Sequence, residues 1–202
     1  MASSRNFFLL VTFVFSSLIL LSSQITVLES QKNSSDLLAK ACKGDYEGWN
    51  TNLCLRILKS SPKIMSSTDR VSFAVSIIEA GIENATNTQT YIKQRLNDPK
   101  TVDQGLKSAL NECIDCFEAG ISSFRSAKLE INGTDDNKDY ISADYDLSVL
   151  YGQVYRCDDF LTKYKVKESV VSIGLKYVTY FSYPALNIVE DLESTSPPPL
   201  KF

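Results

Sequence analysis

The chain has 202 residues, with 21 basic and 24 acidic side chains, a formal net charge of −3 and no histidine. The absence of histidine excludes Ser-His-Asp and Cys-His catalysis, histidine-ligated zinc and the commonest general base near neutral pH, so a binding protein is favoured over an enzyme with a metal or cofactor. No cluster of lysine and arginine interrupts the chain, and we expect no nucleic-acid partner.

Residues 1–23 are the first predicted element. They contain one basic residue (Arg5), an apolar run from Phe7 to Leu21 and then small residues. This pattern predicts a secretory signal peptide rather than a membrane anchor, because the run is shorter than the roughly 20 residues that span a bilayer. We therefore expect a secreted protein without a membrane span after cleavage. Candidate glycosylation sites are the N-x-S/T sequons at Asn33, Asn84 and Asn132.

After cleavage about 180 residues remain, which is typical of one domain. We assign residues 24–194 to this domain and the proline-rich residues 195–202 to a disordered tail. The domain begins with two short helical segments joined by a loop rich in turn-forming residues. Cys42 and Cys54 lie one on each arm of this hairpin, and Trp49 in its loop is a candidate contact or docking residue.

Four long amphipathic segments follow, at about residues 71–98, 100–131, 140–164 and 166–192. Ser67 and Thr68 are candidate N-caps of the first segment. The apolar side of the third is rich in Tyr, Leu and Val and includes Cys157. The fourth is rich in β-branched residues, but an isolated strand would have no partner, so we predict a helix with a kink or a break at Pro184. Together the segments predict an all-α, up-down-up-down four-helix bundle with an N-terminal helical hairpin.

The five cysteines of a secreted chain are expected to pair and leave one over. Cys42 with Cys54 closes the hairpin. Cys113 and Cys116 lie one turn apart on a single helix, where a bond would cross-link nothing distant, and the apolar stripe of that helix directs Cys113 towards Cys157. We therefore predict the disulfides Cys42–Cys54 and Cys113–Cys157. Cys116 is left as a free thiol, either buried at the edge of the bundle or available for an intermolecular bond.

Short motifs occur in a characteristic order along the chain. They are C-x-x-x-L from Cys54 to Leu58, A-L-x-x-C-x-x-x-aromatic from Ala109 to Phe117, Asp139-Tyr140, and C-x-x-F from Cys157 to Phe160. With the signal peptide and the absence of histidine, this order resembles the plant invertase and pectin methylesterase inhibitor family over about residues 37–192. The resemblance implies a four-helix bundle with the same two disulfides. It also implies a secreted protein of the cell wall, less favourably of the vacuole, that is not an enzyme but caps the active-site cleft of a carbohydrate-acting enzyme in a 1:1 complex.

The resemblance also bears on the target enzyme. Invertase inhibitors of the family carry Pro-Lys-Phe just after the aspartate that matches Asp139, whereas this chain has Tyr140, Ile141 and Ser142 there. Pectin methylesterase is therefore the favoured target and acid invertase the alternative. For pectin methylesterase, the resemblance places inhibitory contacts on the second and third bundle helices, at Asp115, Asp139 and Asp159. The alternative for each is an ordinary solvated carboxylate.

Two other classes of function fit parts of the pattern. A secreted redox protein would use Cys113 and Cys116 as a dithiol. A helical binder of small apolar ligands would need a roomy cavity, but the helix stripes are filled with Leu, Ile, Phe and Tyr, which favours a packed core.

Overall fold

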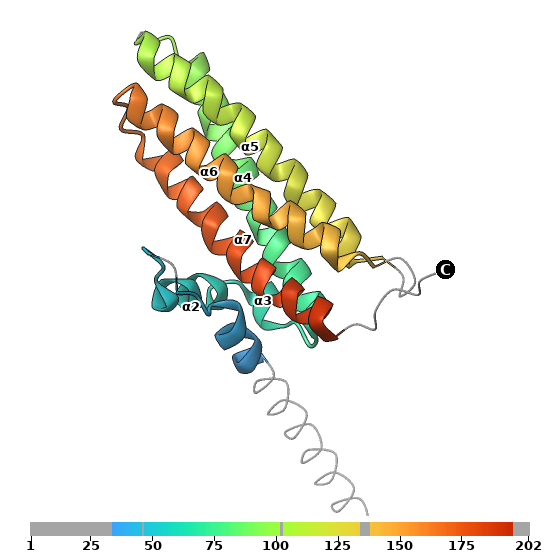
Figure 1. The fold of residues 1–202 in the computed structure, drawn as a ribbon. Coiled ribbons are helices and arrows are strands. Elements are labelled where there is room, and N and C mark those ends of the chain that lie inside the picture. Colours follow the sequence, from blue (N-terminus) through green and yellow to red (C-terminus); the bar gives the residue numbers. More distant parts are fainter. Residues whose placement is uncertain (1–33, 46, 102, 134–137, 196–202) are drawn as a thin grey trace, which may run out of the picture.

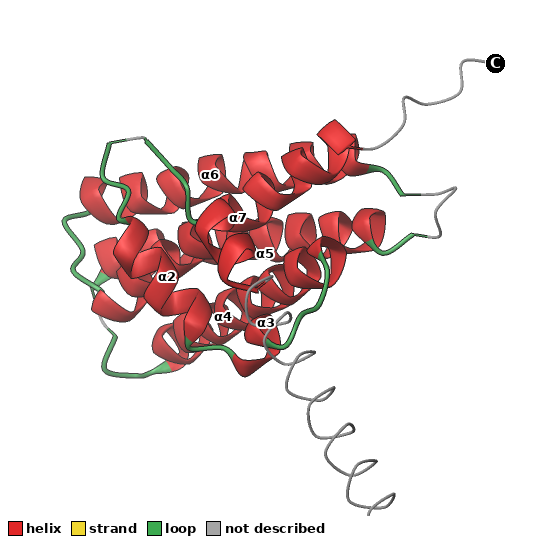
Figure 2. Ribbon diagram, turned by 90° about the horizontal axis from the view of Figure 1, so that it is seen from below, coloured by secondary structure: helices red, strands yellow, loops and turns green. Residues whose placement is uncertain are grey.

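The computed structural model describes residues 34–45, 47–101, 103–133 and 138–195. Its four long helices are α4 (Arg70–Asn97), α5 (Gln104–Ile131), α6 (Tyr140–Lys163) and α7 (Ser169–Thr195). They run alternately up and down beside one another (Figure 1), and Figure 2 shows helices and loops but no strand in the described part of the chain. The predicted all-α bundle is confirmed. The predicted signal peptide, Asn33 and residues 196–202 of the predicted tail lie outside the described residues.

The hydrophobic core lies between the four long helices, because α4 and α6 each pack against both α5 and α7. On α5 the buried side chains include Leu110, Cys113, Phe117 and Phe124, which recur three and four positions apart along one stripe. Gly81 of α4 lets α5 approach closely, since a Cβ there would lie 2.6 Å from the ring of Phe124. The interior is therefore filled by side chains that interdigitate across the helix pairs.

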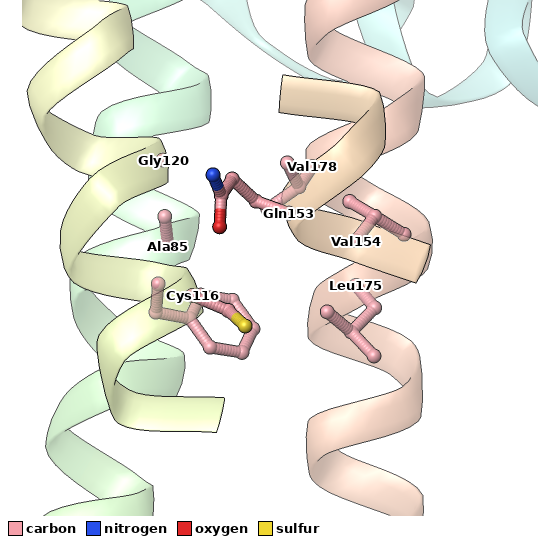
Figure 3. A pocket seen from close by; sticks show the side chains of 8 residues that line it. Ala85, Cys116, Gly120, Gln153, Val154, Leu175 and Val178 are labelled. Carbon is pink, nitrogen blue, oxygen red and sulfur yellow. The ribbon is translucent and has the colours of Figure 1, made fainter. Parts of the chain in front are cut away.

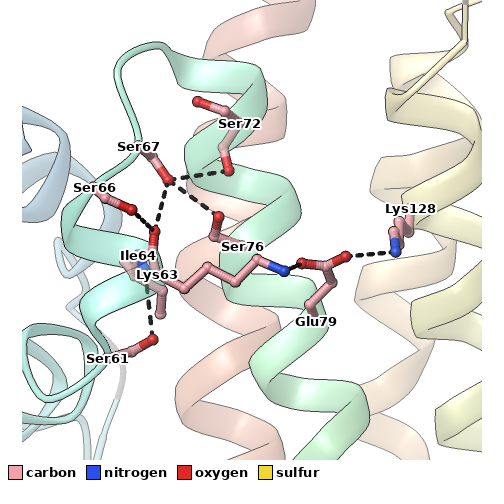
Figure 4. A network of polar contacts seen from close by, with 9 residues as sticks. All are labelled: Ser61, Lys63, Ile64, Ser66, Ser67, Ser72, Ser76, Glu79 and Lys128. Carbon is pink, nitrogen blue, oxygen red and sulfur yellow. Dashed lines mark hydrogen bonds and ion pairs between the residues drawn. The ribbon is translucent and has the colours of Figure 1, made fainter.

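The first bundle helix begins one residue later than its predicted caps. The N-cap of α4 is Asp69, so the prediction of Ser67 or Thr68 is wrong. Asp69 Oδ1 accepts a hydrogen bond from the Ser72 N–H at 2.9 Å, and the Asp69 N–H donates to Ser72 Oγ at 3.3 Å, which is a reciprocal capping box. Ser67 is instead buried, with its hydroxyl 3.1 Å from that of Ser76 (Figure 4).

The last bundle helix, α7, continues through Pro184 without the predicted break. A proline inside a helix costs about 3 kcal/mol or more, because it removes a backbone hydrogen bond and crowds the preceding turn. Pro184 is buried, as are its neighbours Phe181 and Ala185. Burial of this stretch against α4 and α6 offsets the local cost and keeps the helix intact.

The N-terminal hairpin packs at one end of the bundle (Figure 1). It consists of helical residues 34–41, α2 (Thr51–Lys59) and α3 (Pro62–Met65). The Cys42–Cys54 disulfide joins its arms, with Cα atoms 5.7 Å apart. On the chain-entropy account, closing so short a loop contributes roughly 3 kcal/mol. The predicted disulfide-bonded hairpin is confirmed.

Contacts with α7 hold the hairpin against the bundle. Trp49 acts as a docking residue, because its ring stacks on Tyr180 of α7 with the centroids 4.7 Å apart. Asn187 of α7 donates hydrogen bonds from Nδ2 to the carbonyl oxygens of Ala41 at 2.8 Å and Lys43 at 2.7 Å. Backbone groups at the end of the first hairpin helix are thereby satisfied by a side chain of the bundle.

Asp191 is the ionic centre of the same contact. Its carboxylate pairs with Lys40 of the hairpin and, at 3.0 Å, with Arg70 at the start of α4. Burial acts to raise the pKa of Asp191, but the hydrogen bonds and charges of Lys40 and Arg70 outweigh it and hold the pKa below its usual value. The pairs therefore stabilise the docked hairpin as long as Asp191 is ionised.

A second ionic bridge joins three elements and is shown in Figure 4. Glu79 of α4 pairs with Lys63 of α3 and, at 2.6 Å, with Lys128 of α5. The hydrogen bonds from Lys128 and Lys63 lower the pKa of Glu79. The hairpin is thus anchored to the bundle on two sides.

We predict that Asp191→Asn lowers the free energy of unfolding by about 1 kcal/mol, because both cations are about half exposed and solvent screens the pairs. This corresponds to a melting temperature lower by roughly 2–4 °C. The folded-state pKa lies below the unfolded value, so the stabilisation is present above about pH 4 and is lost as the pH falls through the folded pKa. Wild type and variant are expected to converge at low pH.

Thermal unfolding followed by circular dichroism at about pH 6 and about pH 3 measures this effect. Glu193→Gln is the matched control, because Glu193 is an exposed carboxylate two residues further along α7. Equal melting temperatures for Asp191→Asn and wild type at the higher pH would contradict the prediction.

Candidate functional site

A single buried disulfide locks α5 and α6 together. Cys113 and Cys157 are bonded with Cα atoms 4.7 Å apart, and neither residue is exposed. On the chain-entropy account, closing this longer loop contributes roughly 4 kcal/mol. The bond also sets the register and rotation of α5 against α6, and so determines which side chains of the two helices face outward.

Two of the predicted contact residues, Asp115 and Asp159, each lie two positions after a cysteine of this disulfide. Two residues correspond to about 200° around a helix, which puts both carboxylates on the outer side of their helices. Both residues are exposed. Because α5 and α6 are antiparallel, the two positions are only about 6 Å apart along the bundle axis. The structure therefore places this pair at one level of the bundle.

The third predicted contact residue, Asp139, lies at the other end of α6. It is the N-cap of this helix, about 30 Å along the helix from Asp159. Its carboxylate accepts hydrogen bonds from the Ser142 N–H at 3.0 Å and the Ser142 hydroxyl at 2.7 Å, and these bonds lower the pKa of Asp139. The three aspartates do not form one cluster, and Asp139 already has a structural role.

The outer face of α6 carries a continuous exposed strip that links these two ends. Its members follow one another at spacings of four, three, four, three and four residues, so they share one side of the helix. We call this strip the α6 ridge; it comprises Ile141, Tyr145, Ser148, Gly152, Tyr155 and Asp159. Ile141, Tyr145 and Tyr155 are 62%, 67% and 51% exposed. Exposed aromatic and aliphatic side chains in a row are typical of a protein-binding surface.

The expectation that the tyrosines belong to the buried side of α6 is wrong. Leu147 and Leu150 fill that side together with Cys157. Tyr151 lies beside the ridge, and its ring meets that of Tyr155 edge-on with the centroids 4.4 Å apart. The hydrogen bond between the two hydroxyls raises the pKa of Tyr151. The regular spacing of the ridge was the signal in the sequence that could have revealed this face.

Carboxylates gather where α5 ends and α6 begins. Burial and the charges of Asp146 and Asp139 raise the pKa of Glu130, against a weaker opposing hydrogen bond from Ser126. Burial alone raises the pKa of Asp144 on the same helix. Negative charge is therefore concentrated at this end of the bundle, which disfavours acidic ligands and suits a partner with basic groups.

Cys116 is a free and buried thiol, 2% exposed. Together with residues that include Gly120 and Gln153, it lines a cavity of about 10 Å³ (Figure 3), which has room for about one water molecule and none for an apolar ligand. Burial raises the pKa of the thiol, so it stays protonated near neutral pH. Because Cys113 is bonded to Cys157, the C-x-x-C does not form a dithiol in this structure.

Two other kinds of site were searched for in the described ranges. Within them, no group of three or more cysteine, aspartate or glutamate side chains is arranged to hold a metal ion. None of the helices in these ranges is both long and apolar enough to cross a membrane. The outer surface of α5 and α6 is accordingly the candidate site, and its chemistry is that of a binding surface.

Comparisons with known proteins agree with this description. The sequence profile of the family described as plant invertase/pectin methylesterase inhibitor matches residues 36–188. A protein named cell wall / vacuolar inhibitor of fructosidase 2, from Arabidopsis thaliana, is 32% identical over 159 residues, which cover 77% of this chain and 76% of that protein. A putative invertase inhibitor of Platanus acerifolia is 27% identical over 168 residues, covering 82% and 84%.

Solved structures show the same fold. A pectin methylesterase inhibitor from Arabidopsis thaliana superimposes with a TM-score of 0.55 at 19% identity, over 70% of this chain and 87% of that chain. Mutant form A of a pectin methylesterase inhibitor from Arabidopsis gives a TM-score of 0.61, also at 19% identity, over 70% and 89%. At this level of identity the likeness concerns the fold.

The state of Cys116 leads to a prediction about thiol reactivity. The denatured but unreduced protein is expected to contain one free thiol per molecule, whereas the native protein should react at least about tenfold more slowly, because the thiol is buried and protonated. Ellman titration with and without guanidinium measures both quantities. Cys116→Ala is the control that abolishes the reaction, and two or more thiols in the unreduced chain would contradict the disulfide assignment.

Proposed function

Because the chain belongs to the plant invertase/pectin methylesterase inhibitor family, we propose that it is a secreted inhibitor that forms a 1:1 complex with a cell-wall enzyme, pectin methylesterase. The family and the relatives named above are inhibitors and not enzymes. Such a role needs a rigid surface that fits over a cleft, and the outer side of α5 and α6 offers one.

The conformation of residues 140–142 is the observation that carries the choice of target. These are the positions where, by resemblance, invertase inhibitors have Pro-Lys-Phe. Here Tyr140, Ile141 and Ser142 form the first turn of α6, and Ser142 is hydrogen-bonded to its cap Asp139. The segment is part of a capped helix rather than a projecting wedge, which supports pectin methylesterase over invertase.

The α6 ridge is the surface that we assign to the contact. Tyrosine supplies a large contact area at a low cost in side-chain entropy and is enriched among residues that dominate binding energy. Gly152 leaves a flat place between Tyr151 and Tyr155, because a Cβ there would meet nothing within 4 Å. Asp159 ends the ridge, and Asp115 adds a carboxylate at the same level of α5. Since carboxylates lose their charge towards about pH 4 and below, inhibition should weaken there.

Acid invertase is the second candidate target. The observation in its favour is that the relatives with 32% and 27% identity are named as inhibitors of fructosidase and of invertase. Sequence identity weighs the whole chain, whereas the helical start of α6 weighs one contact element.

Parallel inhibition assays test the proposed function. The purified mature protein is titrated against a pectin methylesterase and an acid invertase at mildly acidic pH. We expect loss of pectin methylesterase activity close to equimolar ratio and no effect on invertase. Inhibition of invertase alone would reverse the target, and inhibition of neither enzyme would refute the proposal.

A substitution in the middle of the ridge tests the contact surface. Gly152→Arg is expected to raise the inhibition constant by at least about tenfold, because a long side chain would hold the partner away, whereas the fold should not suffer since arginine favours a helix over glycine by roughly 0.5–1 kcal/mol. Ser172→Arg, at an exposed position of α7, is the matched control and should leave inhibition unchanged. Full inhibition by Gly152→Arg with an undiminished melting temperature would remove the ridge from the contact.

A further inference from the structure

We propose that Asn132 carries an N-linked glycan and that this glycan leaves the adjoining end of α6, around Asp139, outside the contact with the target enzyme. The first part depends on the geometry of Asn132 and on a secretory route. The second part rests on the proposed function.

Asn132 is placed where a glycan can be accommodated. It is the C-cap of α5 and is exposed, and its backbone N–H donates to the Lys128 carbonyl at 3.1 Å. The backbone is therefore held by the helix end while the side chain is in water. Asn132, Gly133 and Thr134 form a sequon; Thr134 lies outside the described residues, and only its identity matters here.

Asn84 provides an internal comparison, because it has a sequon but a different setting. It lies in the middle of α4, and its Oδ1 atom is buried without a hydrogen-bond partner among the described residues. Its neighbour Ala85 is part of the core. A glycan on Asn84 would have to leave from an amide that packs against the bundle, whereas one on Asn132 extends from the tip of a helix.

The two disulfides support the compartment that this chemistry requires. Disulfides persist in oxidising environments such as the secretory pathway, where glycans are transferred to asparagine. The donor is a lipid-linked oligosaccharide diphosphate. A bond forms between Nδ2 of Asn132 and C1 of the first sugar, the bond from C1 to the diphosphate oxygen breaks, the lipid diphosphate leaves, and the amide proton passes to the transferase. No oxidant or reductant takes part.

The position of the glycan has a consequence for the α6 ridge. The Asp139 N–H donates to the Glu130 carbonyl at 3.2 Å, which ties the start of α6 to the last turn of α5, next to Asn132. A glycan on Asn132 therefore lies beside Asp139. Gly152 is about 20 Å further along α6 and Asp159 about 30 Å further. The contact with the enzyme is accordingly assigned to the part of the ridge from Gly152 to Asp159.

Mass spectrometry of the secreted protein tests the first part. The full chain with its own leader is expressed in plant cells, purified from the medium and treated with a peptide N-glycosidase in ¹⁸O-water, which converts each glycosylated asparagine to labelled aspartate. We expect label at position 132, its loss in Asn132→Gln and in Thr134→Ala, and its retention in Asn84→Gln. An unlabelled residue 132, in cells that glycosylate a co-expressed control protein, would overturn the proposal.

Inhibition assays test the second part. Removal of the glycan from the native protein, and separately Asp139→Asn, should each change the inhibition constant less than about twofold, because asparagine also serves as an N-cap and the charge is not used in the contact. A tenfold or larger change in either case would overturn this part. If the wild-type protein inhibits neither enzyme, the proposed function fails, while the mass measurement still decides whether Asn132 is glycosylated.

Discussion

The buried bond between Cys113 and Cys157 is the constraint on which the composition of the outer surface depends. Hydrophobic packing is not directional, and two amphipathic helices can bury their stripes at more than one register. A slip of one turn would displace α6 by about 5.4 Å against α5. The covalent link excludes such slips, so Asp115 and Asp159 stay at one level and the α6 ridge stays on the outside.

The N-terminal hairpin extends this rigidity to the rest of the fold. Its contacts with α7 combine an aromatic stack through Trp49 with the ion pairs of Asp191, and Glu79 connects it to α4 and α5. A surface that is rigid before binding loses little conformational entropy when it meets its partner, so more of the contact energy appears as affinity. This is the stability requirement of an inhibitor that covers a cleft, and it differs from the requirement of an enzyme that must build a cleft of its own.

Much of the fold follows from the sequence because the helical period of apolar residues is strong in the long segments. The predicted helix at residues 140–164 is Tyr140–Lys163 in the structure, and the predicted hairpin is present with its disulfide. Local choices were harder. Asp69 replaces Ser67 as a cap because Ser67 is drawn into a buried contact with Ser76, which is a tertiary effect. Tyrosine is ambiguous between core and surface because one ring carries both an apolar body and a hydroxyl, so the ridge was missed.

The candidate site shows the limit of residue-by-residue transfer from a family. Asp115, Asp139 and Asp159 look equivalent as carboxylates in the sequence, but only Asp139 has its oxygens occupied by the backbone and hydroxyl of Ser142. A carboxylate that caps a helix cannot turn towards a partner without leaving those donors unpaired. On the ridge, the two kinds of contribution are therefore separated in space. Tyr155 and its neighbours supply the area that holds a partner, while Asp159 and Asp115 supply the charge that orients it, because complementary charge improves encounter and register more than affinity.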